Sequence, residues 1–146
     1  MNQSIKTTAS ASLTNGAHTL PLILLVEDDD IIQMVHQRFI EQCGYQVHSV
    51  NTGQAALNRL AQYDYAAIVL DLGLPDIKGE EVILAIRKRE KDTHQYLPIM
   101  VNTAHGDAEI FAECRKKGAD ATFLKPIMLK QFRQVLMQLI QPKVSI

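Results

Sequence analysis

The chain has 146 residues, of which 47% are hydrophobic and 21% are charged, and its formal net charge is −1. A chain of this length is long enough for one domain with a hydrophobic core but short for two. The nearly neutral charge excludes the strongly basic surface of a protein that binds DNA directly, and no apolar run approaches the ~20 residues of a membrane span. We therefore expect a globular cytoplasmic protein without a membrane span.

Residues 1–20 are rich in Ser, Thr, Ala and Asn and show no sustained periodicity, which predicts a flexible leader or linker. The folded domain is expected over residues 21–142, followed by a short tail at 143–146. Cys43 and Cys114 lack the spacing of a metal site or of a disulfide framework, so we expect two free thiols.

From Leu22 onward, short apolar runs alternate with segments of helical periodicity. The runs predict five strands, with the sequences LILLV, VHSV, AAIVL, PIMV and ATFL. The apolar spacing predicts a helix after each strand, around residues 31–35, 56–60, 82–86, 111–114 and 132–139. This alternation indicates an α/β fold in which helices cover both faces of a parallel sheet.

Polar and glycine residues mark the ends of several of these helices. Asp29 and Thr52 stand where side chains cap the N-termini of the first and second helices. Asp30, in the first turn, is favoured by the helix dipole. Gly44 and Gly118 stand where residues in the left-handed conformation end the first and fourth helices.

The candidate functional residues are those that directly follow the strands, because ligands of open parallel sheets bind beyond the carboxyl ends of the strands. They are Glu27 and Asp28 after the first strand, Asp71 after the third, Thr103 after the fourth and Lys125 after the fifth. Clustered carboxylates suit a hard cation such as Mg²⁺, and a lysine and a threonine beside them suit an anion with several oxygens. A metal site next to an anion site favours phosphoryl chemistry.

Four motifs make the chain resemble a receiver domain of bacterial two-component signalling. Such domains occur in response regulators and in hybrid sensor kinases. They are the acidic pair that ends LILLVED, the aspartate within VLDLGLPDIKGEE, the NTA after the fourth strand and the FLKP after the fifth. The resemblance covers residues ~22–140, nearly everything outside the leader. It implies a doubly wound, flavodoxin-like (βα)5 fold with strand order 2-1-3-4-5.

The resemblance implies that Asp71 is the phosphoacceptor of a phosphorelay. It would take a phosphoryl group from a phosphohistidine on a histidine kinase or a histidine phosphotransfer domain, and so form an aspartyl phosphate. Asp28, Asp71 and the main-chain carbonyl of Gly73 would ligate Mg²⁺ or Mn²⁺, whereas Glu27 would act mainly through a metal-bound water. The family more often has aspartate at the position of Glu27. Glutamate carries the same negative charge.

Two further residues have roles that the resemblance implies. Lys125 would pair with one phosphoryl oxygen, with a cis peptide bond before Pro126. The Thr103 hydroxyl would hydrogen-bond to another oxygen and move toward it when Asp71 is modified. The family usually has an aromatic residue three positions before the lysine, and Thr122 stands there instead. We therefore expect a muted conformational switch, with Phe123 remaining buried.

Other functions are weighed against the same residues. A flavodoxin-like nucleotide binder would offer hydroxyl and N–H groups after the first strand, where this chain is anionic. An aspartate phosphatase would have a second acid two residues after its nucleophile, where this chain has Gly73. We expect no enzyme beyond self-catalysed phosphotransfer and autodephosphorylation, and an output through contacts with a downstream protein. A degenerate receiver, which binds partners without phosphorylation, remains the alternative.

Overall fold

The computed structural model describes residues 20–140. The predicted tail at 143–146, and all of the predicted leader except Leu20, lie outside these residues. The elements follow one another in the order β1 (Leu22–Val26), α2 (Asp30–Gln42), β2 (Gln46–Val50), α3 (Gly53–Gln62), β3 (Ala67–Leu70), α4 (Gly79–Thr93), β4 (Ile99–Thr103), α5 (Ala108–Lys117), β5 (Ala121–Leu124) and α6 (Leu129–Ile140). None of the helices in the described part of the chain has the length and the apolar character that crossing a membrane requires.

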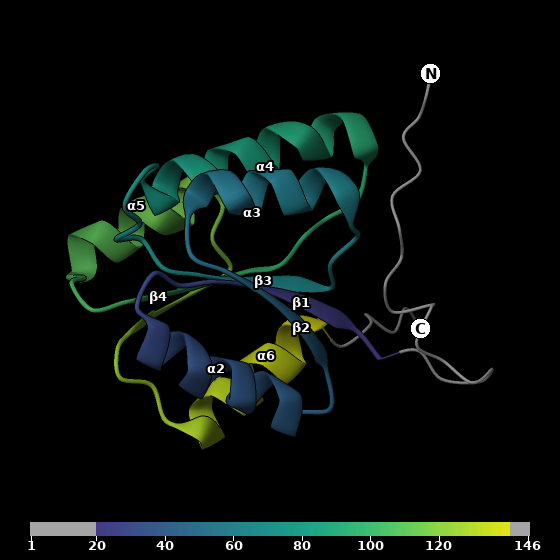
Figure 1. The fold of residues 1–146 in the computed structure, drawn as a ribbon. Helices are drawn as coiled ribbons and strands as arrows, with labels where there is room; N and C mark the ends of the chain where they lie inside the picture. The colour runs from purple at the N-terminus through teal and green to yellow at the C-terminus, as the bar shows by residue number, and fades with distance from the viewer. Residues whose placement is uncertain (1–19, 141–146) are drawn as a thin grey trace, which may run out of the picture.

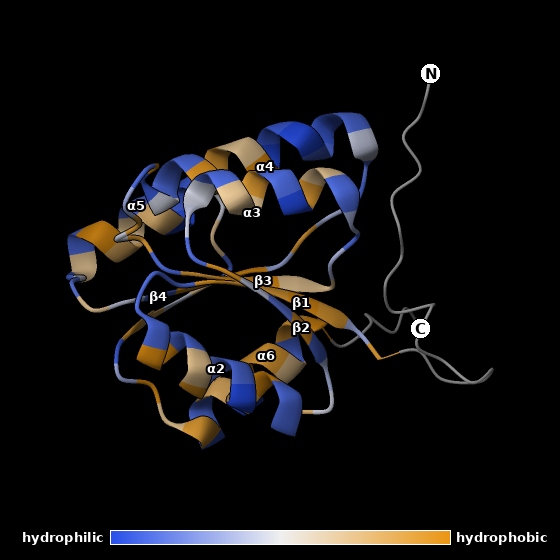
Figure 2. Ribbon diagram, in the orientation of Figure 1, coloured by the Kyte–Doolittle hydropathy of each residue, from blue (hydrophilic) through white to orange (hydrophobic). Residues whose placement is uncertain are grey.

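The five strands form one parallel sheet in the order β2-β1-β3-β4-β5, which confirms the predicted order. Helices α2 and α6 cover one face of this sheet, and α3, α4 and α5 cover the other (Figure 1). The central strands are hydrophobic along their length because helices bury both of their faces (Figure 2).

Each face of the sheet has its own hydrophobic core. Leu24, Leu70 and Val101 belong to the core beneath α3, α4 and α5. Val69 and Met100 belong to the core beneath α2 and α6. Successive side chains along β3 and β4 therefore point to opposite faces, as the pleat of a strand requires.

The predicted helix boundaries are confirmed where local chemistry sets them. The Asp29 carboxylate accepts hydrogen bonds from the backbone N–H groups of Ile31 and Ile32, and Thr52 caps α3 through its hydroxyl. Gly44 and Gly118 have φ angles of 91° and 122°. These positive φ angles favour glycine.

The predicted end of the fourth strand is wrong by two residues. We expected the run PIMV to end at Val101, with Asn102 and Thr103 following it. β4 instead continues through Thr103 and pairs with β5 at both added residues. Pairing with β5 thus outweighs the low strand propensity of Asn102.

Candidate functional site

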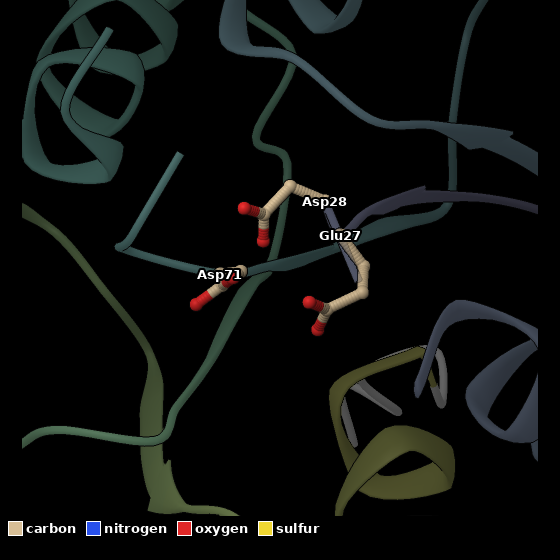
Figure 3. Close-up of side chains that lie close together, drawn as sticks. All are labelled: Glu27, Asp28 and Asp71. Carbon is tan, nitrogen blue, oxygen red and sulfur yellow. The ribbon is translucent and has the colours of Figure 1, made fainter. Parts of the chain in front are cut away.

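The three predicted acids come together at the carboxyl ends of β1 and β3. The pairing of Val26 with Leu70 places the next residues, Glu27 and Asp71, side by side. Asp28 approaches them from the start of the loop that leads to α2, and the three carboxylates face a common space (Figure 3). Each residue contributes a carboxylate oxygen, and these oxygens lie within 4.8 Å of one another.

Lys125 reaches the same cluster from the end of β5. Its Nζ lies 2.5 Å from Oε1 of Glu27 and 3.4 Å from Oδ2 of Asp71, and the side chain is largely buried. The Lys125–Pro126 peptide bond is cis, as predicted. One ammonium group thus partly offsets the charge of two carboxylates, while Asp28 remains exposed to solvent.

The crowding of acids opposes their ionisation. Burial raises the pKa of Glu27 to about 7, with a further contribution from the charge of Asp71, although the hydrogen bond from Lys125 opposes the shift. Partial desolvation raises the pKa of Asp28 as well, followed by its hydrogen bond and charge interaction with Asp71. A cation bound between these side chains would favour their charged forms.

The backbone around Asp71 fixes this residue firmly in the fold. Its N–H donates to the carbonyl of Val26 at 3.0 Å, and its Oδ1 accepts from the N–H of Gly73 at 3.2 Å. The first residue of α4, Gly79, packs so closely that an added Cβ would lie 2.6 Å from Cα of Leu72 and 2.8 Å from the carbonyl oxygen of Asp71. Glycine is therefore required for α4 to begin against the site.

The loop after Asp71 is joined to α3 by a contact that was not predicted from the sequence. Oδ1 and Oδ2 of Asp76 accept hydrogen bonds from the backbone N–H groups of Gly53 and Gln54, each at 2.8 Å. These bonds hold the pKa of Asp76 below its usual value, although desolvation opposes the shift. Asp76 supplements Thr52 in satisfying the first N–H groups of α3. No sequence signal pairs residues so far apart.

Thr103 lies at the end of β4 and is buried. Its hydroxyl accepts from the N–H of His105 at 3.3 Å and makes no hydrogen bond to Asp71 within the described residues. Gly106 packs against this side chain, since an added Cβ would lie 2.9 Å from Cγ2 of Thr103. The structure therefore brings Glu27, Asp71 and Lys125 into contact, whereas Thr103 stands beside them without bonding to Asp71.

Two buried polar residues near the site were not predicted to be functional. Asn102 on β4 and His36 on α2 are buried, and neither Nδ1 of His36 nor the amide atoms of Asn102 have a hydrogen-bond partner in the part of the chain that is described. A sequence signal for Asn102 does exist. It is the polar residue that directly follows the apolar run PIMV and precedes Thr103.

A family model described as the response regulator receiver domain matches residues 23–137. The chain belongs to the response regulator receiver family. Receiver domains are the phosphoacceptor modules of two-component signalling, and the family implies a kinase or a phosphotransfer domain as partner. They are generally signalling modules and not enzymes.

Two curated proteins illustrate the relationship. Sensory/regulatory protein RpfC of Xanthomonas campestris pv. campestris (strain 8004) is 29% identical over 117 residues, which are 80% of this chain and 16% of that protein. Transcriptional regulatory protein SrrA of Staphylococcus aureus (strain NCTC 8325 / PS 47) is 33% identical over 104 residues, which are 71% of this chain and 41% of that protein. The chain therefore spans less than half the length of either relative.

Solved receiver structures share the fold. The receiver domain of sensor histidine kinase PA1611 from Pseudomonas aeruginosa PAO1 has a TM-score of 0.75 and 27% identity, with 85% of this chain and 100% of that chain covered. That structure contains a magnesium ion coordinated in its active site cleft. The fold and the family inferred from the sequence are thus both confirmed.

Proposed function

We propose that this receiver takes a phosphoryl group from a phosphohistidine onto Asp71 and passes the signal on through protein contacts. The observation that carries the proposal is the convergence of Glu27, Asp28 and Asp71 within 4.8 Å, with Nζ of Lys125 against two of them. Carboxylates crowded in this way are costly without a cation. The family supports the same chemistry.

The donor set fits Mg²⁺, because this ion prefers oxygen ligands and is usually held by one or two carboxylates together with phosphate oxygens. We propose that Asp28, Asp71 and the main-chain carbonyl of Gly73 hold it, with Glu27 acting through a water, and that Mn²⁺ substitutes for it. When bound, the ion would neutralise charge on the carboxylates and on the incoming phosphoryl oxygens.

In the transfer step, a carboxylate oxygen of Asp71 attacks phosphorus while the bond between phosphorus and the donor imidazole nitrogen breaks. The electron pair of that bond stays on the imidazole. Lys125 exchanges its contact with Glu27 for one with a phosphoryl oxygen, and the Thr103 hydroxyl donates to another. The backbone around Asp71 holds the carboxylate for attack.

The later steps follow from the same site. Water hydrolyses the aspartyl phosphate by self-catalysis, so that the signal has a finite lifetime. A shift of Thr103 and of the loop through His105 would change the surface that a downstream partner recognises. We place this activity in the cytoplasm, where histidine kinases present their phosphohistidines.

The first prediction is that Asp71→Asn abolishes phosphorylation without unfolding the protein, because the substitution removes a charge from a crowded acidic site and leaves the core intact. Wild-type protein, Asp71→Asn and Asp92→Asn would be incubated with acetyl phosphate, with and without Mg²⁺, and the bound phosphate measured. Asp92, exposed on α4, is the matched control.

We expect acid-labile, hydroxylamine-sensitive phosphate on the wild type and on Asp92→Asn, only in the presence of Mg²⁺. The same phosphate on Asp71→Asn would contradict the assignment. A folded wild-type protein that binds Mg²⁺ but is never labelled would instead be a degenerate receiver.

A further inference from the structure

The Asn102 side chain is buried without the hydrogen bonds that its amide requires. Only 2% of the residue is exposed, and neither Nδ2 nor Oδ1 has a partner among the residues that the structure describes. An amide removed from water without compensation destabilises a fold. An apolar residue of similar size would avoid this cost, since Met100 fills the same face of β4 two residues earlier.

The strand register places this amide beside the phosphoacceptor. Leu70, the last residue of β3, pairs with Val101, so Asp71, which directly follows β3, lies next to Asn102 of β4. On its other side, Asn102 pairs with Phe123 of β5. Laterally paired residues of parallel strands point to the same face of the sheet.

That shared face is the one beneath α2 and α6. Met100 and Phe123 both pack in this core, so alternation along β4 directs the Asn102 side chain there as well. Glu27 lies on the opposite side of Asp71 in the same row. Asp71 is thus flanked by the carboxylate of Glu27, which follows β1, and by the carboxamide of Asn102 on β4.

We propose that Asn102 donates a hydrogen bond from Nδ2 to the Asp71 carboxylate when the aspartyl phosphate is hydrolysed. This inference rests on the proposed function of Asp71. In that step a water oxygen bonds to phosphorus and the bond from phosphorus to the Asp71 oxygen breaks. The electron pair returns to the carboxylate, and the water's proton leaves with inorganic phosphate or enters solvent.

The amide acts on the charge that this step creates. Negative charge develops on Asp71 as it leaves, and a donor fixed beside it in a water-poor environment stabilises that charge. In the unphosphorylated protein, one carboxylate oxygen of Asp71 contacts the N–H of Gly73 and the other contacts Lys125. The side-chain amide of Asn102 has no partner among the described residues. Burial of the unpaired Asn102 amide destabilises the resting fold, but it places a donor where dephosphorylation needs one. Buried polar groups without partners are concentrated at functional sites.

The test compares Asn102→Leu with His36→Leu. Both remove a buried, unpartnered polar group from the core beneath α2 and α6, but only Asn102 is a lateral neighbour of Asp71. Wild-type and variant proteins would be labelled with acetyl phosphate and Mg²⁺, freed of donor, and followed for loss of phosphate. Urea unfolding would be measured on the same samples, and Asn102→Val would serve as a second variant.

We expect the phosphorylated state of Asn102→Leu to last about tenfold longer, the change that corresponds to losing one charge-assisted hydrogen bond in the rate-limiting step. Asn102→Val would behave alike, His36→Leu would keep the wild-type lifetime, and the Leu variants would unfold at higher urea. A wild-type lifetime in both Asn102 variants, equal lengthening in His36→Leu, or a lower urea midpoint for Asn102→Leu would overturn the inference alone. Failure to label wild type would overturn the proposed function as well.

Discussion

At the scale of single residues, the packing around His36 determines the protonation state of its imidazole. Its ring lies between Phe39 and Phe132, with centroid distances of 5.8 Å and 5.4 Å, and only 4% of the residue is exposed. The pKa of His36 is lowered to about 4, chiefly by burial and also by the positive charge of Lys125, although the charge of Asp71 opposes the shift. The folded protein therefore holds this imidazole in its neutral form.

A pH dependence of stability follows from this shift. Between about pH 6.5 and pH 4, the unfolded chain binds a proton at His36 that the folded chain does not. Protonation of His36 in the unfolded chain therefore costs no stability above the unfolded pKa of about 6.5. As the pH falls, it lowers the free energy of unfolding by about 2–3 kcal/mol over this window. We expect the free energy of unfolding of His36→Leu not to show this decrease at low pH.

Urea unfolding followed by circular dichroism between pH 4 and pH 8 would measure the difference, which grows toward low pH. Glu27, whose pKa is raised, has a dependence of the opposite sign, but it titrates in both proteins and cancels. Parallel stability curves for wild type and His36→Leu would show that His36 titrates normally in the folded protein.

The success of prediction at single residues depends on how local the cause is. Asp29 and Thr52 cap their helices through bonds to N–H groups two or three residues away, so the sequence alone indicates them. The sequence shows Asn102 as a polar residue after an apolar run, but its position next to Asp71 follows only from the strand register. The burial of His36 likewise depends on its packing against Phe132 of α6, which is distant in the sequence.

At the scale of elements, the junction of β1 and α2 divides four consecutive acids between two tasks. Glu27 and Asp28 belong to the carboxylate cluster. Asp29 accepts from the N–H groups of Ile31 and Ile32 at 2.9 Å each, and Asp30 occupies the first turn of α2. The helix thus uses two acids, and two remain for a cation.

We expect Asp28→Ala to weaken Mg²⁺ binding strongly, because it removes a carboxylate from the cluster. Asp29→Ala should leave Mg²⁺ affinity nearly unchanged and lower the free energy of unfolding by about 1 kcal/mol through the lost cap. The chain has no tryptophan to report quenching. Titration calorimetry would therefore measure affinity, and urea unfolding would measure stability. Equal losses of affinity in both variants would mean that the metal ligands are misplaced by one residue.

The order and type of the elements could be predicted because apolar periodicity and capping agree along most of the chain. β1 and β5 have the predicted bounds, at Leu22–Val26 and Ala121–Leu124. The end of β4 could not be predicted, since its last two residues are polar and are kept in the strand by pairing with β5. The Asp76 contacts with α3 depend on the path of a loop, which composition does not define.

At the scale of the whole molecule, the surface formed by α5, β5 and α6 is expected to change little on activation. Thr122 is half-buried, and its hydroxyl accepts a hydrogen bond from Arg115 at 3.0 Å. Phe123 packs on the opposite face of the sheet, against the core beneath α6, and is half-buried, whereas we expected it to be buried. It therefore does not replace an aromatic residue at position 122.

The reason for a muted switch is the small apolar area of Thr122. At roughly 25 cal/mol per Å², its inward rotation would favour the active state by well under the ~1.5 kcal/mol available to an aromatic side chain. We expect crystal structures with and without beryllofluoride to differ around Thr103 and His105 and only modestly on the surface of α5, β5 and α6. A large rearrangement of Phe123, or tight dimerisation through that surface, would contradict this expectation.

The central claim is that Asp71 becomes an aspartyl phosphate, and localising the phosphoryl group tests it most directly. Borohydride reduces an acyl phosphate to an alcohol, so a phosphorylated aspartate is converted to homoserine, which peptide mass spectrometry can place in the chain. After treatment with acetyl phosphate and Mg²⁺, we expect homoserine in place of Asp71 and no conversion when the phosphodonor is omitted. Conversion of another aspartate, or phosphate found only on histidine, serine or threonine, would contradict the claim.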